Sequence, residues 1–257
     1  MAERNERYRG LFLHAKDTAR GDRIVTFLCK EGILSLFLFG GPKSSLRSVA
    51  TPYILADIEV YHDRRNDFSK LTGATILETF DSLHTSFSHM QAAAAAAEFV
   101  IRTSAFGGEY GLALQMITTL LRELSSIEED SAPYAMYAFL WNALAPQGLA
   151  PDISACEHCG KRFTEEGSLP GRLLAGERSF LCARCAEERR RQGFPASAML
   201  LIDAMVLQCL REILNVSYSQ AARCMSANPS LLHIEAIIES LAELAAEGPL
   251  QSLRLFH

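Results

Sequence analysis

Four cysteines in two closely spaced pairs are the residues of this sequence best suited to chemistry. The first pair is Cys156 and Cys159, the second is Cys182 and Cys185, and 22 residues separate the two pairs. Each pair fits on one tight turn, and two such turns can close a tetrahedron of sulfur around one cation. The spacing therefore predicts one structural zinc ion per chain, which replaces the core that so short a loop cannot build.

Other interpretations of the cysteines remain open. A redox dithiol, as in a thiol–disulfide enzyme, needs one Cys-x-x-Cys motif and leaves the second pair without a role. A catalytic zinc keeps one position free, whereas four cysteines fill all four. His158 could replace a ligand, although a solvent-facing place in the turn is the simpler expectation. The remaining Cys29, Cys209 and Cys224 stand among apolar residues and are expected to be buried.

The elements that must position these cysteines change in character near residue 80. Before it, apolar β-branched and aromatic segments alternate with turn formers, which predicts a small barrel of strands at residues 8–16, 23–30, 33–39, 53–61 and 71–80. After it, long apolar periodicities predict helices near 83–104, 109–127, 133–147, 196–215, 217–226 and 230–247. We therefore expect an α+β protein with a barrel domain (1–80) and a helical domain (81–257).

Three local features refine the second domain. The segment 134–147 carries no formal charge, so its helix is expected to be buried on most sides. The zinc-binding loop, at about 153–190, has room for a hairpin through 172–174 and 179–181. Arg189, Arg190 and Arg191 follow the last cysteine beside two glutamates. They are typical of a charged helix end, with a phosphate contact as the alternative.

The charge distribution favours the barrel as a nucleic-acid site. The formal net charge is -5, yet residues 1–50 contain nine basic and five acidic residues. A barrel with basic turns and aromatic strands is suited to single strands, because cations neutralise phosphates while rings stack on bases. An ordinary solvated barrel is the alternative. The candidate DNA-binding residues are Lys16, Arg20, Arg23, Lys43 and Arg47.

Several classes of protein are disfavoured by the sequence. Residues 1–15 lack a signal-peptide pattern, and no apolar run is long enough to span a bilayer, so we expect a cytoplasmic protein. The seven cysteines are an odd number and four of them have paired spacing, which fits a reducing compartment with a metal site better than a disulfide framework. The motifs GxSxG, GxxxxGK[ST] and HExxH and the Rossmann glycine pattern are missing, and Pro42 interrupts the glycine-rich turn that comes nearest to a phosphate loop. We therefore expect no enzyme.

The order of these parts resembles the bacterial RecO family of DNA repair and recombination mediators. Segments 9–13, 21–27 and 31–32 are similar to the family's first strands, and 41–44 corresponds to its short basic stretch ending in Lys-Ser. The most specific segment is 148–160, which reads Gly-Leu-Ala-Pro-Asp-Ile-Ser-Ala-Cys-Glu-His-Cys-Gly and enters the zinc-binding loop.

The resemblance implies an N-terminal OB-fold, a helical C-terminal domain with a zinc-binding loop, and a non-enzymatic function. Such proteins bind single- and double-stranded DNA, anneal complementary strands and bind the C-terminal tail of single-strand binding protein. With RecR, and often RecF, they help load RecA at the nucleoid. The alternative is a zinc-stabilised protein-interaction scaffold without DNA binding.

The chain departs from the family pattern at two places. Residues 39–42 read Phe-Gly-Gly-Pro where the family usually has several basic residues. No Lys or Arg lies between Arg122 and Lys161, where the family often has a basic residue that could meet an acidic tail. The tail of single-strand binding protein would then contact other cations, such as Arg102 or Arg122.

Overall fold

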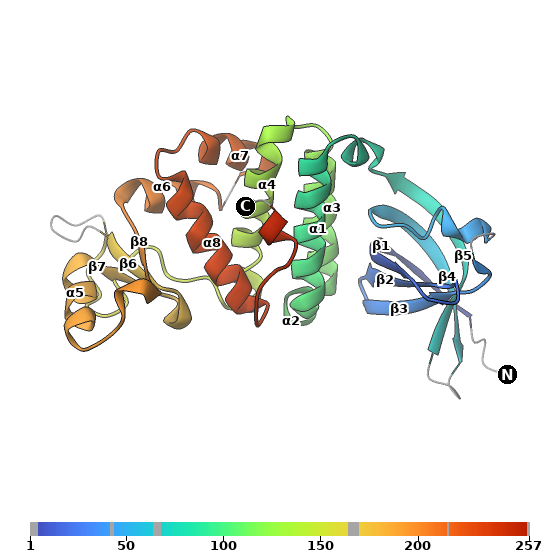
Figure 1. Ribbon diagram of the computed structural model, residues 1–257, viewed down its shortest axis with the longest axis horizontal. Coiled ribbons are helices and arrows are strands. Elements are labelled where there is room, and N and C mark those ends of the chain that lie inside the picture. Colours follow the sequence, from blue (N-terminus) through green and yellow to red (C-terminus); the bar gives the residue numbers. More distant parts are fainter. Residues whose placement is uncertain (1–4, 42–43, 64–67, 164–169, 215, 256–257) are drawn as a thin grey trace. The chain divides into compact units, whose positions relative to one another are not determined.

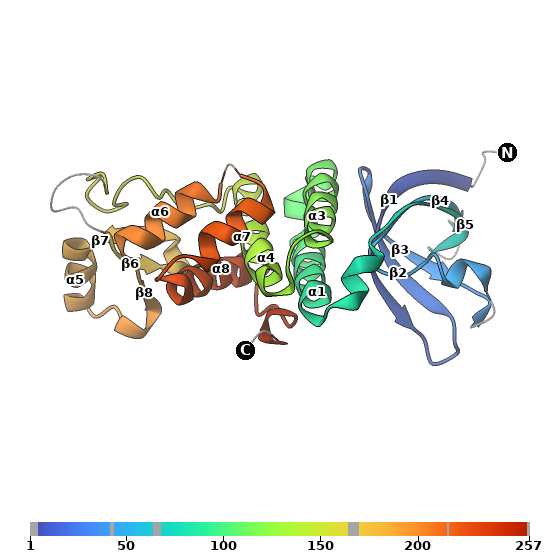
Figure 2. The ribbon, with the colours of Figure 1, turned by 90° about the horizontal axis from the view of Figure 1, so that it is seen from above.

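The computed structural model describes residues 5–41, 44–63, 68–163, 170–214 and 216–255. The chain forms two compact units, Met1–Ser126 and Ile127–His257. The first unit contains a barrel and the helices that follow it, and the second contains helices and a small sheet (Figure 1 and Figure 2). The division at residue 80 remains a prediction, since the first unit adds three helices to the barrel.

Five strands close into a barrel in the order β1-β2-β3-β5-β4. They are β1 (Asn5–Asp17), β2 (Arg23–Cys29), β3 (Gly32–Leu38), β4 (Ile54–Asp63) and β5 (Phe68–Thr79). Neighbouring strands are antiparallel except for β3 and β5, which run parallel and pair Phe37 with Lys70. This is the OB-like barrel that the sequence predicts, and all five expected strands are present.

The long strand β1 closes the barrel because it pairs with two neighbours. Gly10 lies opposite Cys29 of β2 on one side and Ala56 of β4 on the other. A Cβ atom at Gly10 would lie 2.0 Å from the carbonyl oxygen of Leu28, so only glycine allows this approach. The centroids of the Phe12 and Phe27 rings are 4.8 Å apart in the barrel core. Other buried residues of this core are Val25, Leu36, Leu38, Ile58, Val60 and Leu71.

Two helices of the first unit, α1 (Phe87–Arg102) and α3 (Tyr110–Leu124), lie against β1 of the barrel. The Ser86 side chain accepts a hydrogen bond from the backbone N–H of His89 and begins α1. Five alanines of the run 92–97 are buried, as expected for a face that packs closely. Arg122 joins α3 to the barrel through an ion pair with Glu78 of β5, with 2.6 Å between nitrogen and oxygen.

The short element α2 (Ser104–Gly108) between these helices is left-handed. All five of its residues have positive φ angles, from 49° at Ser104 to 106° at Gly108. Such a backbone costs roughly 1–2 kcal/mol for each residue with a side chain. The Thr103 hydroxyl accepts from the N–H of Phe106, whose buried ring packs against Phe99. Hydrogen bonding and burial thus hold the strained turn in place.

Four helices of the second unit pack together, and the central one, α4, carries no formal charge. They are α4 (Ala132–Asn142), α6 (Ala204–Glu212), α7 (Tyr218–Ser226) and α8 (Leu231–Ala245). As predicted for segment 134–147, α4 is buried from Ala135 to Trp141, and it contacts α7 and α8. The Trp141 indole donates to the carbonyl oxygen of Leu210 at 3.0 Å, and the Tyr137 hydroxyl donates to the Glu239 carboxylate. Polar atoms of this central helix are therefore satisfied.

The loop that carries the four cysteines contains a sheet and a helix, and we call residues 153–191 the cysteine loop. The predicted hairpin is confirmed as β6 (Pro170–Leu174) and β7 (Ser179–Cys182), in which Leu173 pairs with Phe180. The helix α5 (Ala183–Arg191) follows β7 and includes the three successive arginines. The interpretation of those arginines as a charged helix end is confirmed, although the helix itself was not among those expected.

The helix expected at 196–215 is wrong at its start. Residues Met199–Leu201 form β8, which pairs with β6 in the sheet order β7-β6-β8. The helix α6 begins only at Ala204, where the Asp203 carboxylate caps the N–H of Val206 at 2.8 Å. A short apolar run suits a strand or a helix equally, and the free edge of β6 decides between them.

Short 3-10 turns complete the described elements. They are Ser45–Arg47, Asp81–Thr85, Glu129–Ser131, Ala145–Gln147, Ala175–Glu177, Ala196–Ala198 and Leu253–Leu255. Among the described residues, no helix combines the length and the hydrophobicity that crossing a bilayer requires.

Replacing the exposed Ser104 by glycine is expected to stabilise the first unit. Glycine adopts a positive φ without steric cost, so Ser104→Gly should raise the free energy of unfolding by about 0.5–1 kcal/mol. Urea denaturation measures the change. The matched control is Gln115→Gly in the right-handed α3, which should lower the same free energy by a similar amount. A loss of stability in Ser104→Gly would contradict a left-handed turn at this position.

Candidate metal centre and nucleic-acid interface

The four cysteines of the two pairs come together at one point. Their sulfur atoms all lie within 4.8 Å of one another, and the Sγ atoms of Cys159 and Cys182 are 3.9 Å apart. Cys156 and Cys159 lie on one turn, Cys182 ends β7, and Cys185 lies in the first turn of α5. A tetrahedral cation with Zn–S bonds near 2.3 Å requires this kind of sulfur separation.

Backbone hydrogen bonds shape the first turn for metal binding. The N–H of Cys156 donates to the oxygen of Lys161 at 2.9 Å, and the N–H of Gly160 donates to the oxygen of Cys156 at 2.8 Å. Gly160 has a φ of 69°, which a residue with a side chain rarely adopts. The N–H of Glu157 donates to Phe180 of β7, so the turn is anchored to the hairpin that carries the second pair.

The surroundings of the sulfurs favour thiolate at one of them. Burial raises the pKa of Cys156, but backbone N–H groups of Cys182, Cys159 and His158 donate to its sulfur and bring the pKa down to about 7. Burial and the neighbouring sulfurs raise the pKa of Cys185. A cation among the sulfurs would favour the charged form of all four. The residues present therefore fit a metal ion.

The chemistry of such a centre is structural. Four sulfur ligands saturate a tetrahedral ion and leave no position for water or substrate. The side chain of His158 is exposed, as expected, and is not part of the cluster. Of the three cysteines outside it, Cys29 and Cys209 are buried, as predicted. Cys224 is only half-buried, and its thiol donates to the Glu212 carboxylate at 3.0 Å.

The barrel residues predicted to contact DNA have different environments. Lys16 and Arg20 are exposed, and their side chains form no ion pair within the described part of the chain. Lys43 lies outside the described residues. Arg23 and Arg47 are only 16% and 19% exposed at their side chains. Of the four described residues, the structure brings Arg23 and Arg47 together at Asp17.

Arg23 and Arg47 form a clasp around one carboxylate. Asp17 accepts from Arg23 at 2.8 Å and from Arg47 at 2.5 Å, and these guanidinium groups, chiefly that of Arg23, hold its pKa below the usual value. Arg23 also donates to the carbonyl oxygen of Ala50, and Arg47 donates to that of Gly21. The clasp joins the β1–β2 turn to the segment 45–50, so these cations position the turn that carries Arg20.

A cluster of aromatic rings lies beside this turn. The rings of Phe37 on β3, of Phe39 directly after it and of Phe68 on β5 have centroids 6.1 Å apart in each pair. The ammonium group of Lys70 lies 5.6 Å from the centroid of Phe39. Together with Arg20, these rings line a cavity of about 500 Å³, which we call the aromatic pocket; its other lining residues are Thr18, Ala19 and Asp22.

The aromatic residues of this pocket were absent from the sequence-based list of site residues, although the sequence carries a signal for them. In β3, Phe37 lies between the buried Leu36 and Leu38, so its ring must point away from the core, and Phe39 directly follows the strand. Phe39 is 42% exposed. Two outward-facing rings at i and i+2 are unusual on a solvated strand and indicate a contact surface. Phe68 is brought to them only by the pairing of β3 with β5.

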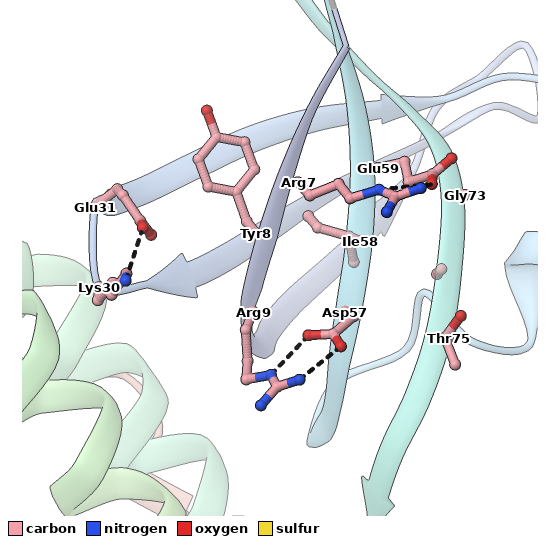
Figure 3. A pocket seen from close by; sticks show the side chains of 11 residues that line it. Arg7, Tyr8, Arg9, Lys30, Glu31, Asp57, Ile58, Glu59, Gly73 and Thr75 are labelled. Atoms are coloured by element: carbon pink, nitrogen blue, oxygen red, sulfur yellow. Dashed lines mark hydrogen bonds and ion pairs between the residues drawn. The ribbon is translucent and has the colours of Figure 1, made fainter.

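A second cavity, of about 730 Å³, lies on the outer face of β1, β4 and β5 (Figure 3). Two of its cations are paired across the strands, Arg7 with Glu59 and Arg9 with Asp57, each at 2.7 Å, and Lys30 pairs with Glu31 at 3.7 Å. The guanidinium of Arg9 keeps the pKa of Asp57 below its usual value. A phosphate would have to displace these carboxylates, so this cavity is a poorer anion site than the aromatic pocket.

Comparison with known proteins agrees with this architecture. The family models described as "Recombination protein O N terminal" and "Recombination protein O C terminal" match residues 1–80 and 84–253. A DNA repair protein RecO from Anaeromyxobacter sp. (strain K) is 30% identical over 180 residues, which are 69% of each chain. Another from Heliobacterium modesticaldum is 26% identical over 249 residues, 96% of this chain and 87% of the relative.

These matches place the chain among proteins of DNA repair and recombination. It belongs to the RecO family, and the resemblance noted in segments 9–44 and 148–160 is confirmed. The first family model covers the OB-like barrel, and the second covers the helices α1 to α8 and the four cysteines.

Removing one sulfur is expected to release the metal ion and destabilise the cysteine loop. Cys156→Ser should reduce the bound metal to well below one ion per chain and lower the free energy of unfolding by an amount on the order of several kcal/mol. Elemental analysis and thermal unfolding measure both effects. The control is Cys224→Ser, which changes a thiol outside the cluster and should leave the metal content unchanged. Full metal content in Cys156→Ser would disprove the centre.

Proposed function

We propose that this chain is a recombination mediator that binds single- and double-stranded DNA and anneals complementary strands. With RecR, it would help load RecA onto DNA covered by single-strand binding protein. The observation that supports DNA binding most strongly is the aromatic pocket, in which three rings adjoin two cations on an OB-like barrel. All of these actions consist of binding, so the proposal needs no catalytic residue.

The aromatic pocket has the two features that a single strand requires. Its rings offer apolar faces to unstacked bases, and each base stacked on a ring contributes about 1–3 kcal/mol. Arg20 and Lys70 lie beside the rings and can neutralise phosphates. The β1–β2 loop that carries Arg20 is one of the segments with which OB-folds bind oligonucleotides. A duplex hides its bases, so it would be held by charge alone.

The predicted DNA contacts divide accordingly. We propose that Lys16 and Arg20 contact phosphates directly, since their side chains are exposed. Arg23 and Arg47 are held by Asp17 and by backbone oxygens, so we propose that they support the turn instead. Lys43 stays a prediction. Annealing would follow because cations on the protein reduce the repulsion between two phosphate backbones.

We propose zinc as the ion of the four-cysteine cluster. A set of four thiolates in tetrahedral spacing is a preferred environment for this ion among divalent metals. The ion would hold the two turns of the cysteine loop together and supply no reaction.

The protein partners follow from family membership. We propose RecR, possibly joined by RecF, and the acidic C-terminal tail of single-strand binding protein. Arg122, one candidate for the tail, is occupied by Glu78 through bonds of 2.6–3.2 Å. A tail that docks there would have to displace this carboxylate, which would weaken its binding.

The aromatic pocket is tested by removing its rings. Phe39→Ala with Phe68→Ala should weaken the binding of an oligothymidylate roughly five- to hundred-fold, because stacking on one or two bases is lost. Arg20→Ala should reduce the slope of log affinity against log salt by about 0.7, as expected for one phosphate contact on a single strand. Fluorescence anisotropy at several salt concentrations measures both.

Two controls come from surfaces outside the pocket. Phe87→Ala removes another exposed ring, and Arg223→Ala removes another exposed cation; both should bind as the unmodified protein does. Equal affinity in the pocket variants and these controls would reject the pocket. A stable protein with no DNA affinity at low salt would instead favour the protein-interaction scaffold.

A further inference from the structure

Four cations of the cysteine loop have no partner for their side chains among the described residues. They are Lys161, Arg162, Arg172 and Arg184, and we call them the loop cations. Lys161, Arg162 and Arg184 are exposed, and Arg172 is half-buried. Most cations elsewhere in the described chain form ion pairs or hydrogen bonds, so this concentration within one short loop requires a reason.

The arginines that follow in α5 differ from the loop cations in this respect. Arg189 pairs with Glu177, while Arg190 and Arg191 both pair with Glu187 at 2.7 Å and 3.2 Å. These two bonds hold the pKa of Glu187 down, at about 2. The charge of the three arginines is therefore largely balanced by Glu177 and Glu187. The run of arginines is thus a weaker anion site than the loop cations.

The fold of the cysteine loop places the backbone of the loop cations near the four cysteines. Lys161 accepts the backbone bond from Cys156, and Arg162 forms a bridge with Ala155 on the same turn. A Cβ atom at Gly171 would lie 2.6 Å from the backbone of Ala183, so β6 and the start of α5 are in direct contact there. Arg172 comes directly after Gly171 in the chain, and Arg184 comes directly after Ala183, so their backbones lie near each other.

The chemistry of this surface suits a phosphate backbone. Guanidinium and ammonium groups without a carboxylate partner can bind phosphate with no ion pair to break, and three of the four are guanidinium groups, which bind it in a bidentate manner. Glu157 and Glu188 are the nearby carboxylates without a side-chain partner in the described structure, so the four loop cations outnumber them there; Glu165 and Glu166 of the loop lie outside the described residues. The cations would also offset the negative charge of four thiolates on one divalent ion. The side chains of Lys161 and Arg184 are exposed, however, so they can also contact a ligand in solution.

We infer that the loop cations form a second phosphate-binding surface, separate from the aromatic pocket, that holds a second nucleic-acid strand. This inference rests on the proposed function, because it assumes that the pocket holds the first strand. Since the second surface would contact phosphates only, it would bind strands of any base sequence and leave their bases free to pair. One chain then carries two strands, which is the arrangement that annealing requires.

The experiment counts the strands bound by the full-length, metal-loaded protein. An oligothymidylate of about 12 nucleotides, which cannot pair with itself, is titrated at low salt and the complexes are sized by analytical ultracentrifugation. The unmodified chain should bind two strands. The triple variant K161Q/R162Q/R184Q should bind one and lose about 2 from the salt slope. The pocket variant F39A/F68A should also bind one strand, through the loop.

The matched control is R189Q/R190Q/R191Q, which changes the net charge by the same amount but removes cations that are already paired. It should still bind two strands. Metal content is measured on every variant, and the triple variant should retain one ion per chain, which separates lost phosphate contacts from a lost fold.

Three results would overturn the inference. If the triple variant equals the unmodified chain in stoichiometry and salt slope, the loop binds no phosphate, while the pocket variant's loss would leave the proposed function intact. An unmodified chain that binds one strand, with a smaller salt slope in the triple variant, would show that both surfaces contact the same strand. An unmodified chain that binds no strand at low salt would reject the proposed function as well.

Discussion

The convergence of four cysteine sulfurs is the constraint on which the cysteine loop depends. Four thiolates within 4.8 Å of one another repel strongly unless a cation lies among them, and four neutral thiols offer only weak hydrogen bonds. The sheet β7-β6-β8 and the helix α5 are short, and the two turns meet only through these sulfurs and a few backbone bonds. We therefore expect metal binding and folding of the loop to be one equilibrium.

The same loop shows how the fold distributes charge. On the barrel, carboxylates bind four arginines: Arg7, Arg9, Arg23 and Arg47. These ion pairs stabilise the barrel, and a ligand would have to break them in order to bind there. Other cations are left without such partners, and several of these lie beside the aromatic pocket or next to the cysteines. A protein with a formal charge of -5 can thus present positive surfaces, because ion pairing removes its carboxylates from the places where cations remain free.

Particular elements mark how far reasoning from the sequence extends. The five strands and the hairpin of the cysteine loop follow from local alternation and turn residues, and they are all present. The strand β8 was read as helix because Met199–Leu201 is a short apolar run, whose conformation is decided by the edge of β6. The left-handed α2 has no sequence signal before Gly107, since Ser104, Ala105 and Phe106 adopt positive φ only under tertiary packing.

By itself, the sequence determined the family, the order of barrel and helical parts, and the four cysteines that come together, because strand alternation and Cys-x-x-Cys spacing are local properties of the chain. Tertiary structure alone decided which cations are available. Arg23 is satisfied by Ala50 and Arg47 by Gly21, and Phe37 meets Phe68, across 24 or more residues in each case. Such partners are set by strand pairing and packing, so the spacing of a charge or a ring along the chain does not reveal whether it is free to bind.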